Sequence, residues 1–107
     1  MKPPVVILPT AEALLLDTAK WWADHRSTDQ AERWYEGIIA AMESLAENPR
    51  RCPIARENPK FPYEVRELLF GLSSRPTHRV LYTIRPESVV IVAVRHVAQQ
   101  DVTPDDI

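Results

Sequence analysis

The hydrophobic pattern of the first half of the chain has a helical period. Leu15, Ala19 and Trp22 recur at intervals of three and four residues, which predicts a helix over residues 10–26. The SxxQ sequence at residues 27–30 is that of a capping box and predicts a second helix, which an Asn-Pro step ends. The apolar face of this second helix consists of Ala31, Trp34, Tyr35, Ile38, Ile39, Met42, Leu45 and Ala46. Because so few residues join the two helices, we expect an antiparallel helical hairpin.

In the second half of the chain the pattern changes to short runs typical of strands. Residues 49–62 contain four prolines and predict an ordered loop. A strand-like run also precedes the helices. The four predicted strands are VVIL at 5–8, YEVRELLF at 63–70, THRVLYTI at 77–84 and SVVIVAVRH at 88–96. The gaps between the last three runs are short enough for hairpins, so these runs predict an antiparallel meander.

This order of elements predicts a single α+β domain over residues 1–107, with the helical hairpin packed on one face of one sheet. The last strand is apolar on both faces as far as Arg95, which indicates a central strand covered on both sides. The apolar pattern then stops. Residues 97–107 form an acidic tail that we expect to be frayed or ordered by a partner, although residues 103–106 resemble the first turn of a helix.

Charge is distributed unevenly along the chain. The overall net charge of −2 is the sum of −4 for residues 1–49, +5 for residues 50–96 and −3 for residues 97–107. The positive excess therefore falls on the predicted meander, and most of it is arginine, whose planar fork suits phosphate and carboxylate groups.

The composition also excludes several classes of protein. No apolar run is long enough to span a bilayer, the single cysteine fits a reducing cytoplasm, and two glycines are too few for a glycine-rich nucleotide loop.

Three arginines of the meander are candidate binding residues. Arg79 interrupts an otherwise apolar strand, where a charge is costly unless it is paired or hydrated. Arg66 on the preceding strand is expected roughly opposite Arg79, and Arg95 lies near the end of the last strand. We interpret Arg66, Arg79 and Arg95 as a basic surface for a polyanion or an acidic partner. The alternative is local pairing with glutamates such as Glu64.

The remaining reactive side chains are less informative. His25, His78 and His96 lack the close spacing of metal ligands, and no metal or other cofactor is predicted, although His78 and His96 are expected to approach each other across the sheet. Cys52 has no recognisable base or orienting partner. The three tryptophans, Trp21, Trp22 and Trp34, lie at helical spacing and predict core packing.

Four segments together resemble the RelE/ParE superfamily of type II toxins, and more closely its ParE-like branch. The resemblance covers about residues 5–97 and rests on AERWYEGIIAAMESLAENPRRCP, VRELLFG, HRVLYTI and VVIVAVRH. It implies a small plasmid-stabilisation toxin that a cognate antitoxin wraps. RelE-type members are ribosome-dependent mRNA interferases, whereas ParE-type members are associated with poisoning of DNA gyrase.

The family's basic positions fall on Arg66, Arg79 and the Arg95-His96 pair. A second basic position expected beside Arg66 is Glu64 here, and the C-terminal tyrosine of the nuclease set is missing. These departures argue against cleavage of mRNA. If the chain is a nuclease, His78 or His96 must supply the base, because arginine does not readily lose its proton.

Three functions therefore stay open. The first is a cytoplasmic toxin that binds DNA gyrase, the second is an endoribonuclease that acts on the ribosome and mRNA, and the third is a degenerate toxin that only binds its antitoxin. No membrane partner is predicted. Both a homodimer and a toxin–antitoxin hetero-oligomer are compatible with the sequence.

Overall fold

The protein folds around one four-stranded mixed sheet in the order β1-β4-β3-β2. A computed structural model describes residues 2–107. The strands are β1 (Val5–Ile7), β2 (Arg66–Phe70), β3 (His78–Ile84) and β4 (Val89–His96). The last three form the predicted antiparallel meander, and β1 adds to it in parallel beside β4. The predicted α+β class and the central position of the last strand are confirmed.

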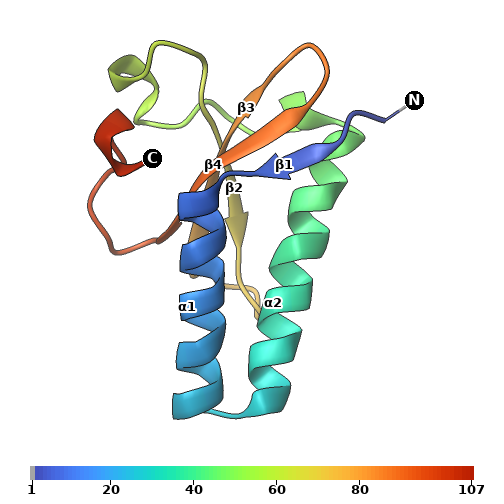
Figure 1. Cartoon of the computed structure of the whole chain (residues 1–107), viewed down its shortest axis with the longest axis vertical. Helices are drawn as coiled ribbons and strands as arrows, with labels where there is room; N and C mark the ends of the chain where they lie inside the picture. The colour runs from blue at the N-terminus through green and yellow to red at the C-terminus, as the bar shows by residue number, and fades with distance from the viewer. Residues whose placement is uncertain (1) are drawn as a thin grey trace.

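Two helices cover one face of this sheet. They are α1 (Pro9–His25) and α2 (Thr28–Glu43), and they run side by side as a hairpin (Figure 1). The Ser27 side chain accepts a hydrogen bond from the Gln30 N–H at 3.1 Å, so the predicted cap opens α2. The predicted apolar face of α2 is buried at Ala31, Trp34, Ile38 and Met42.

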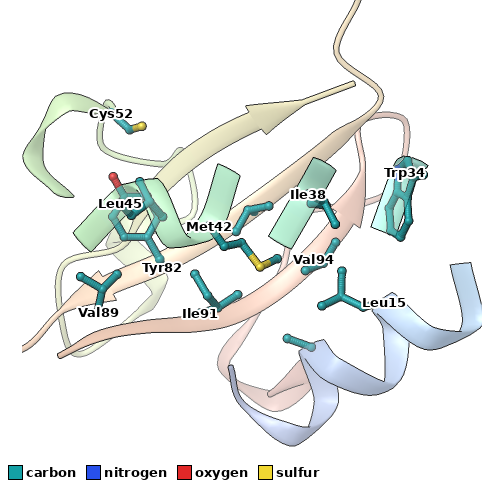
Figure 2. Close-up of a cluster of buried hydrophobic side chains, with 12 residues drawn as sticks. Leu15, Trp34, Ile38, Met42, Leu45, Cys52, Tyr82, Val89, Ile91 and Val94 are labelled. Carbon is teal, nitrogen blue, oxygen red and sulfur yellow. The ribbon is translucent and has the colours of Figure 1, made fainter. Parts of the chain in front are cut away.

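The main core lies between the helices and the sheet. Figure 2 shows Leu15 of α1 and Ile38 of α2 directed toward the strands, with Trp34 at one end of the cluster and Cys52 at the other. The strand residues facing this core are Val80, Tyr82, Val89, Ile91 and Val94. Within residues 2–107, no helix is both long enough and apolar enough to cross a membrane.

A second, smaller core lies on the opposite face of the sheet. It contains Leu81, Val92 and Ala93 from the strands, Phe61 and Val65 from the loop, and Val102 from the tail. The loop and the tail lie side by side at one end of the molecule (Figure 1), and an Arg56–Asp101 ion pair of 2.5 Å joins them. The expected frayed tail is therefore wrong, because Val102 is fully buried against this chain's own residues.

An irregularity in β4 decides which side chains share a face. Leu81 pairs with Ala93 and Tyr82 with Ile91, so Val92 is an extra residue, as in a β-bulge. Beyond the bulge, His78 pairs with His96 and Arg79 with Arg95. The bulge thus sets the two histidines on the helix side and the two arginines on the far side.

Candidate functional site

The five residues predicted as candidate site residues are divided among three places. Arg66 pairs with Tyr82 across β2 and β3, whereas Arg79 pairs with Leu69. The expectation that Arg66 and Arg79 lie opposite each other is therefore wrong. The register of the β2–β3 hairpin is shifted by three residues from the register that would pair these two arginines. Since successive residues of a strand point to opposite faces, Arg66 and Arg79 lie on different faces of the sheet.

Arg79 forms part of a buried charge network on the far face. Its side chain is 3% exposed, and it donates to both carboxylate oxygens of Glu57, at 2.8 and 2.6 Å, and to Glu67. Burial alone would raise the pKa of the Glu57 carboxyl, but hydrogen bonds from Arg79 and from the Val102 N–H outweigh burial and lower the pKa. The hydrogen bonds that Arg79 donates to Glu57 likewise raise the pKa of the Arg79 guanidinium. Arg79 therefore does not contribute to an open basic surface.

Arg66 and Arg95 also have acceptors within the chain. Arg66 donates to the Cys52 carbonyl at 2.6 Å and to a Glu64 carboxylate oxygen at 2.9 Å, so it ties the proline-rich loop to β2. Arg95 pairs with Asp106 of the tail at 2.9 Å and is 23% exposed. A hydrogen bond from the Thr103 N–H, together with the Arg95 charge, lowers the pKa of Asp106. Local pairing with carboxylates, the alternative considered from the sequence, describes all three arginines.

His78 and His96 meet on the helix side, as expected. Their ring centroids are 5.4 Å apart and the rings are nearly perpendicular, at 80°. His78 is buried and also packs edge-on against Trp34, at 5.0 Å between centroids. Burial, with a smaller effect from His96, lowers the pKa of His78 to about 4, so this imidazole is neutral at pH 7. The His96 Nδ1 atom accepts from the Ala98 N–H at 3.1 Å and is therefore unprotonated in the neutral ring.

The two histidines line a pocket of about 530 Å³ beside α1, which we call the histidine–tryptophan pocket. The α1 wall consists of Leu14, Asp17, Thr18, Trp21 and Trp22. The other wall consists of Thr77, His78, His96 and Gln99. Predicted core packing is wrong for Trp21, which is 47% exposed at the rim, whereas Trp34 is fully buried.

This arrangement separates the groups that cleavage of RNA would need together. A nuclease requires a base near the 2′-hydroxyl and cations near the developing phosphate charge. The histidines face α1, whereas Arg79 and Arg95 lie on the opposite face with carboxylates of their own. Within residues 2–107 no group of three or more histidine, cysteine, aspartate or glutamate side chains is placed to hold a metal ion.

Sequence reasoning missed two parts of these sites. The first is Glu57, whose position in an aperiodic proline-rich loop carries no signal of burial. The second is the α1 wall of the pocket. Its signal was present in the sequence, because Leu14, Thr18, Trp21 and Trp22 recur at helical spacing and define one face of α1.

The family model that matches this chain is described as the ParE toxin of the type II toxin–antitoxin system parDE, and it matches residues 5–101. The chain belongs to the ParE toxin family. No curated protein matches the chain. Among solved structures, a chain of the chromosomal ParDE toxin–antitoxin system from P. aeruginosa is similar, with a TM-score of 0.70 and 14% sequence identity. The alignment covers 90% of this chain and 97% of that one, so the ParE fold extends over nearly the whole molecule.

Membership of the ParE family confirms the resemblance seen in the sequence. The chain is a ParE-like toxin of a type II toxin–antitoxin system. At 14% identity the P. aeruginosa structure demonstrates the fold alone.

Proposed function

We propose that this ParE-like toxin acts in the cytoplasm by binding DNA gyrase, and that a cognate antitoxin neutralises it. The observation that supports protein binding over RNA cleavage is the pairing of the sheet arginines. Arg79 donates to Glu57 and Glu67, and Arg95 pairs with Asp106. A phosphate would have to compete with these carboxylates for each guanidinium group.

The antitoxin is proposed as the protein partner that keeps the toxin inactive. Support comes from the matching family, whose members belong to a two-component toxin–antitoxin system, and from the similar P. aeruginosa chain, which comes from a ParDE system. A toxin of this kind has two mutually exclusive states, bound by its antitoxin or free to meet its target. The proposal thus predicts that coexpression with the antitoxin abolishes the effect of the toxin on cell growth.

Pulse-labelling separates the candidate targets in living bacteria. After induction of this chain alone, incorporation of thymidine and of methionine is followed in parallel at short intervals. We expect DNA synthesis to fall before protein synthesis, and we expect the purified chain to inhibit supercoiling by purified gyrase. Arg75→Ala is the control variant for substitution of an exposed arginine, and we expect it to act like the parent chain. Arg75 lies in the turn between β2 and β3, and its side chain pairs with no carboxylate among residues 2–107.

The opposite order of events would overturn the gyrase proposal. If protein synthesis falls first, and the double variant His78→Gln, His96→Gln restores it, the chain is an mRNA nuclease whose base lies in the histidine–tryptophan pocket. If neither synthesis falls while the protein is soluble, the chain is a degenerate toxin that binds only its antitoxin.

A further inference from the structure

The histidine–tryptophan pocket gathers an unusual share of the ring-bearing side chains. All three histidines and all three tryptophans of the chain lie in it or against its walls. Trp21 and Trp22 form a corner, with centroids 5.6 Å apart and planes at 87°. His25 stacks on one face of Trp21, with 4.6 Å between ring centroids, and so helps to hold this indole in place at the pocket wall. The pocket therefore presents preformed aromatic surfaces.

The charge of the pocket favours a cation. Its one carboxylate is Asp17, and within residues 2–107 no lysine or arginine lines it. His78 adds no positive charge at neutral pH, because burial keeps its imidazole unprotonated. The faces of tryptophan rings attract cations through their quadrupole, and a nearby carboxylate adds a direct electrostatic attraction.

We propose that the histidine–tryptophan pocket binds an arginine side chain of a partner protein, stacked on Trp21 and Trp22 and paired with Asp17. The pocket volume of about 530 Å³ exceeds what one side chain needs, so the partner's neighbouring residues also enter it. The inference goes beyond the proposed function, because recognition of a guanidinium group does not depend on the cellular target.

The properties of the pocket select arginine over lysine. A guanidinium group is planar and weakly hydrated, so it stacks on indole and leaves water at a lower cost than an ammonium group. It also carries five donors in a fixed fork. Neutral acceptors also line the pocket. They are the Thr18 hydroxyl on the α1 wall and, on the other wall, the Thr77 hydroxyl and the Gln99 amide oxygen, which already accepts one hydrogen bond from the His96 N–H.

The test is a titration of the full chain with N-acetyl-arginine amide, followed by NMR of the three tryptophan indole N–H groups. We expect the Trp21 and Trp22 signals to shift in a saturable manner, with a dissociation constant in the millimolar range. Trp34 serves as an internal reference, because its indole nitrogen is buried inside the core. The matched ligand is N-acetyl-citrulline amide, which has nearly the same shape and no charge.

Two variants separate the pocket from the rest of the surface. Asp17→Asn removes the carboxylate, and Trp21→Leu removes one aromatic wall; each is expected to weaken binding about threefold to tenfold. Asp24→Asn is the matched control, since Asp24 is an exposed carboxylate of α1 outside the pocket, and the affinity of this variant should be unchanged. Both pocket positions are exposed, so circular dichroism should show an unaltered fold.

Three results would overturn the proposal. The first is the absence of indole shifts at ligand concentrations well above the millimolar range. The second is binding of N-acetyl-citrulline amide, or of N-acetyl-lysine amide in the same titration, as tight as that of the arginine compound. The third is equal loss of affinity in Asp17→Asn and Asp24→Asn. None of these results depends on gyrase or toxicity, so the failure of this inference is distinguishable from the failure of the proposed function.

Discussion

The two faces of the sheet are buried in different ways. On the helix face, α1 and α2 bring a continuous apolar surface onto the strands, and the imidazole of His78 is buried there. On the far face, an aperiodic loop and the tail cover the strands, and they enclose the Arg79–Glu57 ion pair. Periodic amphipathic elements thus cover one face, whereas the other face is closed by segments held through charges.

This difference determines how each face responds to change. Apolar packing loses stability in proportion to the atoms removed, and pH affects the helix face through His78 rather than through these apolar contacts. A buried ion pair contributes little net stability when intact, yet the loss of one partner leaves an uncompensated charge. The far face is therefore the more sensitive of the two to a single charge-removing substitution.

Arg79→Ala is expected to have the largest effect. The substitution leaves the Glu57 carboxylate buried without its bidentate donor, and loss of one partner of a buried pair typically costs about 3–5 kcal/mol of unfolding free energy. Urea denaturation at pH 7 measures this loss. Arg75→Ala, the exposed control, should stay within about 0.5 kcal/mol of the parent protein. A loss below about 1 kcal/mol for Arg79→Ala would mean that water hydrates Glu57.

Acid is expected to weaken the helix face before the far face. The pKa of His78 is about 4 in the folded chain and 6.5 in the unfolded chain, so the unfolded chain binds more protons between these values and stability falls as the pH drops from 6.5 to 4. The loss should be on the order of 2 kcal/mol, allowing for water in the adjoining pocket. The pKa of the Glu57 carboxyl is lower in the folded chain than its unfolded value of 4.5. Its contribution to the far face is therefore complete above pH 4.5 and is lost only as the pH falls through the lower, folded pKa.

The measurement is the unfolding free energy of the parent protein and of His78→Gln at pH 7.5, 5.5 and 4.5. The variant has no imidazole at this position, so its stability should change less than that of the parent over this range. Parallel losses in the two proteins would assign the acid sensitivity to other groups.

Tyr82→Phe is expected to have an intermediate effect on the helix face. The Tyr82 hydroxyl donates to the Pro49 carbonyl at 2.5 Å and so fastens the start of the proline-rich loop over the core. Loss of one such bond should lower the unfolding free energy by about 1 kcal/mol. Hydrogen exchange should increase at the Arg51 amide, which bonds to Asn48 in the same turn. Exchange that increased only in the tail would contradict this assignment.

Asp101→Asn is expected to have the smallest effect. The Arg56–Asp101 pair links the loop to the tail, but the Arg56 side chain is 55% exposed, and exposed pairs contribute roughly 0–1 kcal/mol. Chemical denaturation in low and high salt is the check. A loss as large as that of Arg79→Ala would show that the surface pair, rather than the buried one, holds the tail in place.

The sequence predicted the helix face better than the far face, for a physical reason. The helical spacing of Trp34, Ile38 and Met42 and the strand-like run of residues 77–84 are local signals, and both predicted the correct element. The burial of Glu57 and the docking of Val102 depend on contacts between residues 45 positions apart, which no local period encodes. The bulge at Val92 appears only in the pairing of β3 with β4, which residues far apart in the sequence form, and no local period encodes it.

The Val102 N–H bond to Glu57 has a consequence for the order of events during synthesis. Glu57 and Arg79 are synthesised before Val102, and the chain grows at ~5–20 residues per second. On the order of a second or more therefore passes before residue 102 is added. Its N–H is the last donor to the Glu57 carboxylate, at 3.1 Å. During that interval the second core lacks Val102, so the loop alone is available to cover the far face of the sheet. A nascent toxin is thus incomplete until its tail emerges, and an antitoxin made alongside it has that interval in which to find it.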